Sequence, residues 1–227
     1  MESLEAELAR AREIEMSAVA DAIEAIGFEC TRCGACCTGE EGAEGAEGTN
    51  GDEHTATVFP DEVRELQAST GYDFRDVARP TPFGLYEGEG GLEGETFEWA
   101  LQTDACGDCT FYEEDENGLG GCAVYDDRPH ICRTYPFSLD LGGTSQPMGE
   151  AVDQEGLVRA HECEGLGRDV SRDEAEELAA ALIERAVTEL EEAIAVRDRY
   201  ESVNPAPGEV VVHDSEGTKR PDGSPYE

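Results

Sequence analysis

Nine cysteines, four of them within one eight-residue run, are the feature that most restricts how this chain of 227 residues can fold. The run reads CTRCGACC and supplies Cys30, Cys33, Cys36 and Cys37. Two thiolates separated by two residues can both reach one metal ion, because the intervening turn brings their side chains together. Cys30, Cys33 and Cys36 extend this spacing to three candidate ligands.

The other five cysteines are spread over residues 106 to 163. Cys106 and Cys109 repeat the two-residue spacing in CGDC, and the remaining three are Cys122, Cys132 and Cys163. Three clustered thiols with several more along the chain indicate metal binding rather than a set of inert buried cysteines. We expect His130 and His161 to lie at the surface or beside the ligands, although His161 could replace a missing sulfur.

Other cysteine chemistries fit less well. CGDC has the spacing of a thioredoxin-type redox pair, but that motif opens a helix, whereas the following TFYEEDENGLGG is typical of a hairpin. CAVYDDR has the cysteine-to-arginine spacing of a phosphate-binding loop, yet Asp126 and Asp127 would repel an anion there. A lone catalytic cysteine paired with His130 or His161 has no better support.

The charge balance excludes several classes of partner. Asp and Glu total 54 against 16 Lys and Arg, which gives a net charge of −38. Nucleic acids and anionic membrane surfaces would be repelled, so we expect neither as a partner. The acids run through the whole chain, which indicates adaptation to a salt-rich cytoplasm, where screening shortens the reach of self-repulsion.

The N-terminal segment MESLEAELARAREIEM lacks the basic start and the apolar run of a signal peptide. No stretch approaches the ~20 apolar residues that a membrane-spanning helix needs. We therefore expect a cytoplasmic location, where cysteines are usually thiols or metal ligands rather than disulfides. An odd number of cysteines also prevents complete internal pairing.

Apolar spacing predicts two long helices that flank the cysteine region, one over residues 2–26 and one that starts at a capping box of Ser171 and Glu174. Short strands are expected in HTATVF and TFEWALQ, and a helix from Pro60 to about Ser69. The glycine- and glutamate-rich stretches 39–53 and 87–95 are predicted loops. We expect an α+β fold: a small metal-organised domain with few short strands, flanked by the two helices.

Four parts are expected along the chain. Residues 1–27 form the N-terminal helix, and residues 28–170 form the cysteine-cluster metal-binding domain. Residues 171–203 form a C-terminal helix that packs on this domain. Residues 204–227 are rich in proline, glycine and charge, so we expect a disordered tail.

Residues 28 to 168 resemble a known family. FECTRCGACC and the downstream CAVYDDRPHICRTYPF are similar to the signature of the YkgJ-type cysteine-cluster family, a CxxCxxCC zinc- or iron-chelating domain whose members often carry the name Fe–S oxidoreductase. Cys106 has no counterpart in that signature, so we expect it to be a spare thiol. The resemblance implies eight metal ligands, which are Cys30, Cys33, Cys36, Cys37, Cys109, Cys122, Cys132 and Cys163.

The resemblance implies an iron–sulfur cluster or zinc, in one or two sites, with a redox role as one expectation. Because adjacent side chains diverge, we expect Cys37 to serve a second metal or a different edge of a cluster from Cys36. Four thiolates around zinc or a cubane cluster leave a formal charge of about −2. Arg128 and Arg133 are candidates to offset this charge. The alternative, which we weigh equally, is that both arginines form ordinary ion pairs with neighbouring acids.

Two further interpretations stay open. Flagellin lysine N-methylases are similar in this domain, so the resemblance also implies a metal-dependent protein-modifying enzyme, although no glycine-rich cofactor loop of recognisable form is present in the sequence. The other interpretation is a zinc-stapled interaction module without catalysis, whose protein partner the sequence does not identify. The expected partner in every case is a metal ion or cluster.

Removal of salt should weaken folding. At a net charge of −38, repulsion among the acids grows as the screening distance lengthens from about 3 Å at 1 M to about 10 Å at 0.1 M salt. Thermal unfolding in molar and in tenth-molar sodium chloride measures the effect, and we expect the lower midpoint in dilute salt. Equal midpoints would contradict the halophilic interpretation.

Overall fold

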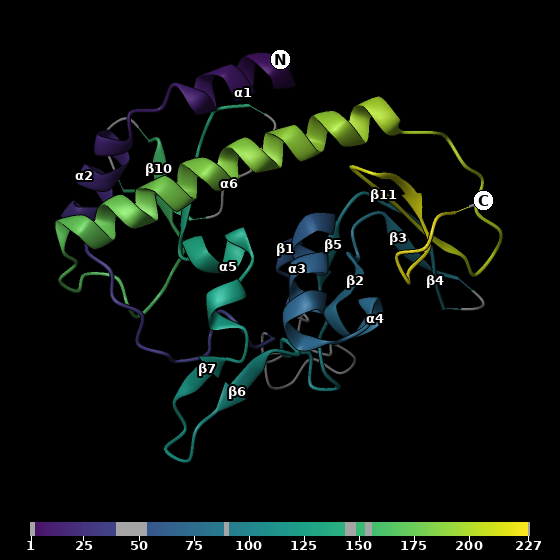
Figure 1. Cartoon of the computed structure of the whole chain (residues 1–227), viewed down its shortest axis with the longest axis horizontal. Coiled ribbons are helices and arrows are strands. Elements are labelled where there is room, and N and C mark those ends of the chain that lie inside the picture. Colours follow the sequence, from purple (N-terminus) through teal and green to yellow (C-terminus); the bar gives the residue numbers. More distant parts are fainter. Residues whose placement is uncertain (1–2, 40–53, 89–90, 144–148, 153–155, 227) are drawn as a thin grey trace. The chain divides into compact units, whose positions relative to one another are not determined.

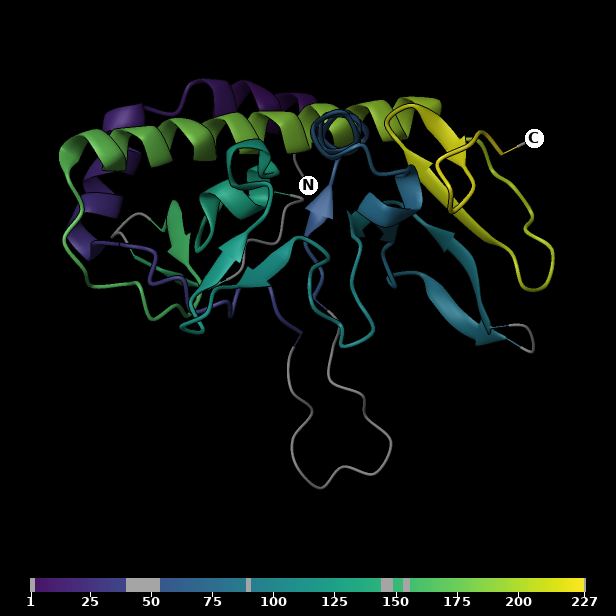
Figure 2. The same cartoon turned by 60° about the horizontal axis from the view of Figure 1, so that its bottom comes forward.

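The computed structural model describes residues 3–39, 54–88, 91–143, 149–152 and 156–226 (Figures 1 and 2). The chain forms two compact units. Unit 1 comprises Met1–Cys33 and His130–Ile194, and unit 2 comprises Gly34–Pro129 and Ala195–Glu227. The first boundary between the units therefore falls inside the cysteine run.

Unit 1 packs helices with one small sheet (Figure 1). Its helices are α1 (Leu4–Arg12), α2 (Met16–Ile26), α5 (His130–Thr134) and α6 (Arg172–Arg199) up to Ile194. Its antiparallel sheet has the order β8-β10-β9, formed by Phe137–Leu139, Val158–Ala160 and Glu150–Ala151. The core gathers apolar side chains from α2, α6, β8 and β10, among them Val19, Ile23, Phe137, Val158 and Leu182.

The start of α6 follows from local sequence. Ser171 and Glu174 form the expected capping box, which satisfies two otherwise unpaired N–H groups. The backbone N–H of Ser171 donates to the Glu174 carboxylate at 2.9 Å, and the backbone N–H of Glu174 donates to the Ser171 hydroxyl at 3.3 Å. The capping prediction is confirmed.

The N-terminal segment forms two helices, so the expectation of one helix over residues 2–26 is wrong. The chain leaves helical geometry at residues 13–15. Leu8 of α1 packs in a small cluster with Leu190, whereas Val19 and Ile23 of α2 pack in the main core with the sheet. The break lets the segment bury its apolar side chains in two separate clusters.

Unit 2 combines short helices with small sheets. The helices are α3 (Pro60–Thr70), α4 (Phe74–Val77) and the short 3₁₀ helix η1 (Tyr125–Asp127). One sheet has the order β1-β5-β2, formed by Thr57–Val58, Trp99–Leu101 and Ala78–Pro80. A second has the order β12-β11-β4-β3, formed by Gly217–Lys219, Val210–Asp214, Gly91–Thr96 and Leu85–Gly88. The hairpin pairs β6 (Tyr112–Glu114) with β7 (Gly120–Cys122).

Several local predictions are confirmed in unit 2. A helix starts at Pro60, strands form within HTATVF and TFEWALQ, and TFYEEDENGLGG folds into the β6-β7 hairpin. The predicted loop over residues 87–95 is wrong, because most of it belongs to the antiparallel pair β3-β4. The predicted loop over residues 39–53 falls outside the described residues except for Gly39. The α+β class is confirmed.

The expected disordered tail is also wrong. Strand β11 pairs in parallel with β4, and β12 pairs antiparallel with β11. Val211 and Val212 are fully buried. Burial of this apolar pair offsets the entropy lost when the segment is ordered. The sequence did not indicate a strand here, because the apolar run is short and is surrounded by proline, glycine and charged residues. The other domain boundaries stay predictions.

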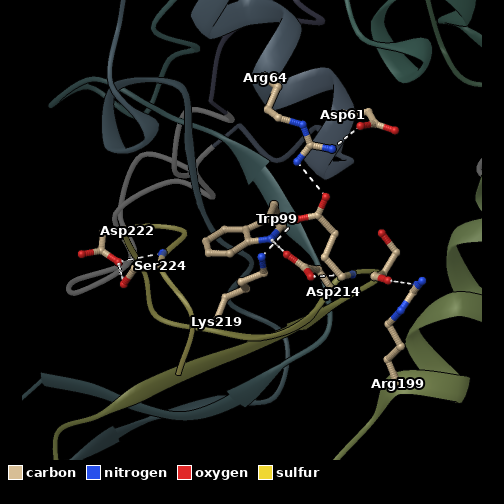
Figure 3. Close-up of polar contacts among 10 residues, drawn as sticks. Asp61, Arg64, Trp99, Arg199, Asp214, Lys219, Asp222 and Ser224 are labelled. Atoms are coloured by element: carbon tan, nitrogen blue, oxygen red, sulfur yellow. Dashed lines mark hydrogen bonds and ion pairs between the residues drawn. The ribbon is translucent and has the colours of Figure 1, made fainter. Parts of the chain in front are cut away.

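Polar contacts fix the C-terminal segment to the rest of unit 2 (Figure 3). The indole N–H of Trp99 donates to the Asp214 carboxylate at 2.9 Å, and both side chains are buried. Arg64 of α3 forms an ion pair with Glu216 at 2.8 Å, and the Lys219 ammonium lies 3.0 Å from the same carboxylate. These contacts hold the β11-β12 turn against α3 and β5.

Among the described residues, the helices are either too short or too polar to cross a membrane.

Loss of the Asp214 carboxylate should loosen the C-terminal strands. Asp214→Ala leaves the buried indole N–H without its acceptor, which we expect to cost about 1–3 kcal/mol of unfolding free energy. Trp99 is the single tryptophan of the chain, so its fluorescence reports on this contact directly. We expect a lower unfolding midpoint and red-shifted emission. Glu65→Ala removes the same charge from an exposed position of α3 and is the control; equal midpoints and spectra for both variants would contradict the role of Asp214.

Candidate metal centre

The nine cysteines divide between the two units, and all nine are free thiols. Unit 1 holds Cys30, Cys33, Cys132 and Cys163. Unit 2 holds Cys36, Cys37, Cys106, Cys109 and Cys122. Each unit therefore contains four of the eight cysteines that the sequence predicts as ligands, and unit 2 contains Cys106 in addition.

A tight turn brings the two adjacent cysteines of unit 2 together. The backbone N–H of Cys37 donates to the carbonyl of Gly34 at 2.7 Å. Gly34 has a φ of +83°, a conformation that favours glycine. The sulfur atoms of Cys36 and Cys37 lie 3.7 Å apart. The expectation that these adjacent side chains diverge is wrong, because the turn directs both sulfurs to one side.

Cys109 and Cys122 belong to the same part of unit 2. The backbone N–H of Cys109 donates to the carbonyl of Cys37 at 2.8 Å, which ties CGDC to the cysteine run. Cys122 lies in β7 and pairs with Tyr112 of β6. Tyr112 in turn follows Cys109 by three residues. Buried Phe111 connects Cys109 to this hairpin.

The thiols of unit 2 influence one another electrostatically. The side-chain hydrogen bond from Cys37 lowers the pKa of Cys36 to about 7. Burial raises the pKa of Cys109 to about 11, and the neighbouring Cys122 and Cys36 add to that rise. Burial also raises the pKa of Cys122. The Cys36 thiol is thus the one closer to ionisation at neutral pH, whereas burial favours the protonated thiols of Cys109 and Cys122.

Arg128 supplies positive charge to this group. Its guanidinium lies over the Tyr125 ring at 3.8 Å, and its Nε donates to the Tyr125 carbonyl at 3.0 Å. From there its charge lowers the pKa of Cys36 and opposes the rise at Cys122. Arg133 lies exposed on α5 in unit 1. Its part in offsetting cluster charge stays a prediction.

Cys106 differs from Cys109 in its surroundings. Cys106 is exposed, and its backbone N–H donates to the Asp104 carboxylate at 2.7 Å in a polar loop. Cys109 is 6% exposed. The two-residue spacing alone did not distinguish them.

In unit 1, the segment around Cys163 contacts the stretches that carry the other cysteines. The Thr31 hydroxyl donates to the Glu164 carboxylate at 2.6 Å. Thr31 directly follows Cys30 in the sequence, and Glu164 directly follows Cys163. The backbone N–H of His161 donates to the carbonyl of Pro136 at 2.9 Å, just beyond α5. The His161 ring packs edge-on against Tyr135, with a centroid distance of 6.0 Å.

Gly165 is a positioning residue that the sequence interpretation missed. Its backbone N–H donates to the Cys163 sulfur at 3.4 Å. A Cβ atom at this position would lie 2.5 Å from the carbonyl oxygen of Glu29, so only glycine permits the close approach of the segments around Glu29 and Gly165. The glycine two residues after Cys163 was a visible signal for this role.

Within the described part of the chain, no three His, Cys, Asp or Glu side chains are arranged as they would be around a bound metal ion. The observed features are the 3.7 Å separation of the Cys36 and Cys37 sulfurs, the backbone N–H groups beside the sulfurs of Cys109, Cys122 and Cys163, and the positive charge of Arg128 near Cys36.

Comparison with known proteins gives one match. Searches of curated proteins and of solved structures found no significant match. Residues 29–164 match the family model described as CxxCxxCC, "Putative zinc- or iron-chelating domain". The match covers more than half of the chain and includes all nine cysteines. The chain therefore belongs to the CxxCxxCC family of zinc- or iron-chelating domains.

Proposed function

We propose that the chain binds a single zinc or iron ion in unit 2 through the thiolates of Cys36, Cys37, Cys109 and Cys122. The observation that carries this proposal is the 3.7 Å separation of the Cys36 and Cys37 sulfurs. Four sulfurs about 2.3 Å from a central zinc form a tetrahedron with edges of about 3.8 Å. The adjacent thiols thus already have the spacing of two ligands on one ion.

The same spacing favours one ion over an iron–sulfur cluster at this site. In a cubane cluster the cysteine thiolates bind different iron atoms, so their sulfurs lie farther apart than two ligands of one ion. Zinc and a single iron both accept four thiolates, and spacing does not distinguish them. Acid-labile sulfide in the purified protein would contradict the single-ion assignment.

A complete set of four protein ligands indicates a structural role. Structural zinc sites are closed by four protein ligands, whereas catalytic sites keep a position open for water or substrate. Zinc bound by four thiolates carries a formal charge of about −2. Arg128 offsets part of this charge, and the backbone N–H groups of Phe111 and Val124 donate to the sulfurs of Cys109 and Cys122.

Metal binding would supply stability that the protein core of this region lacks. The four cysteines lie in the turn at Gly34, in the loop that ends at Cys109 and in strand β7 of a two-stranded hairpin. An isolated two-stranded hairpin is marginally stable in water. The binding free energy of a structural metal becomes folding free energy, because the unfolded chain has no assembled site.

Chelation should therefore destabilise the protein. We expect anaerobically purified protein to contain zinc or iron, and we expect removal of the metal with a chelator to lower the thermal midpoint. Elemental analysis and thermal unfolding before and after chelation, then after re-addition of zinc or ferrous iron, measure both effects. Protein that contains neither metal and takes up neither would contradict the proposed function.

Cys106 and Cys109 should respond differently to substitution. Cys109→Ser removes a buried ligand and should lower the metal bound per chain, whereas Cys106→Ser changes an exposed thiol and should leave it unchanged. The two substitutions are chemically identical and three positions apart, so each is the control for the other. Equal metal loss from Cys106→Ser would require that all nine cysteines be reconsidered as ligands.

A further inference from the structure

Strand β3 forms one edge of the four-stranded sheet in unit 2. The sheet order β12-β11-β4-β3 places β4 on one side of β3, and the described residues provide no strand on its other side. Edge strands present unpaired backbone N–H and C=O groups, which proteins commonly shield with lysine, proline or a bulge. The sequence of β3 is Leu-Tyr-Glu-Gly, which contains neither lysine nor proline. This edge can therefore accept another strand.

Hydrogen bonds within the sheet show which backbone groups of β3 point outward. The N–H of Gly94 in β4 donates at 2.9 Å to the carbonyl of Glu209, just before β11. Because successive backbone groups of a strand point to opposite sides, the N–H of Glu93 is directed at its partner in β3, Tyr86. By the same alternation, the N–H and carbonyl groups of Glu87 point away from β4, toward the open edge.

A cavity of about 400 Å³ lies on one face of this part of the sheet. Tyr86, Glu93 and Glu95 line it from β3 and β4, and residues 204–207 line it from the opposite side. Tyr86 and Glu93 are cross-strand partners, and Glu95 is two residues further along β4, so the three side chains share a face. Ligand pockets measure about 300–1,000 Å³, so this cavity suits a small group such as one side chain.

The lining of the cavity favours a cation. The backbone N–H of Gly208 donates to the Glu93 carboxylate, and a backbone N–H carries no formal charge to neutralise it. The His213 Nε2 atom lies 2.8 Å from the Glu95 carboxylate and orients it. The Tyr86 side chain is 60% exposed, so its ring is accessible to a ligand. Carboxylates beside the face of an aromatic ring attract a guanidinium or ammonium group.

We infer that the β3 edge of unit 2 binds an extended, basic segment of another protein. The segment adds a strand to the sheet through the outward backbone groups of Glu87, and an arginine or lysine side chain opposite Tyr86 enters the cavity. Charge selects this occupant. A second copy of the chain would bring Glu87 and Glu93 of both copies together, and like charges oppose pairing. The inference does not depend on the proposed metal site.

Peptide binding to the full chain tests the inference. Fluorescence anisotropy is measured with labelled ten-residue peptides, at a salt concentration at which the chain is folded. A peptide of alternating arginine and threonine should bind, and one of alternating glutamate and threonine should not. The arginine peptide with every second backbone nitrogen methylated keeps its charge but cannot pair along an edge, so it should bind at least about fivefold more weakly. Equal binding of the two arginine peptides, or no binding of either, would overturn the inference.

Matched variants of the chain locate the site. Glu87→Pro and Glu87→Ala remove the same charge, but only proline removes the outward N–H, and proline is tolerated on edge strands. Glu87→Pro should therefore bind the arginine peptide at least about fivefold more weakly than Glu87→Ala. Glu93→Gln should weaken binding by about fivefold or more, whereas Glu65→Gln, at an exposed position of α3, should leave it unchanged.

Thermal unfolding establishes which variants are folded. Equal affinities for folded Glu87→Pro and Glu87→Ala would contradict pairing along β3, and equal affinities for Glu93→Gln and Glu65→Gln would contradict binding in the cavity. If Glu87→Pro does not fold, the comparison of the two arginine peptides on the wild-type chain decides whether the edge is used.

Discussion

The sulfur atoms of the adjacent Cys36 and Cys37 lie 3.7 Å apart, and the proposed unit 2 site has to compensate the charge of two thiolates at this distance. If both were ionised, they would repel each other by up to about 4 kcal/mol at an effective dielectric constant of about 20. A cation between them turns this cost into coordination. Three features act on this pair of thiols. The tight turn at Gly34 positions them, a backbone hydrogen bond joins Cys37 to Cys109, and the charge of Arg128 lowers the pKa of Cys36.

The acidic composition of the chain increases the contribution that a bound metal cation would make to stability. With a net charge of −38, the protein has few positive groups to hold its acids together. The described strands are two to six residues long, so the small sheets bury limited apolar area. The proposed four-thiolate site would cross-link the loops and short strands of unit 2 from within. Metal binding by the clustered cysteines would thus add stability to an acidic chain whose small sheets bury limited apolar area.

Much of the local structure could be predicted from the sequence. The capping box at Ser171, the helix start at Pro60 and the hairpin after Cys109 follow from short-range rules, and the structure contains each of them. The family match at residues 29–164 likewise confirms the resemblance that the cysteine signature carried. Cysteine spacing identified the candidate ligands of the proposed site.

Long-range features could not be predicted in the same way. The composition of the last segment concealed Val211 and Val212, whose burial depends on a parallel partner far away in the sequence. The convergence of the Cys36 and Cys37 sulfurs depends on a glycine conformation, and the division of the cysteines depends on which unit each segment joins. The coordination shell itself tests the account most directly. X-ray absorption at the metal edge should show four sulfur ligands per ion, at about 2.3 Å if the metal is zinc; a shell dominated by nitrogen or oxygen would contradict it.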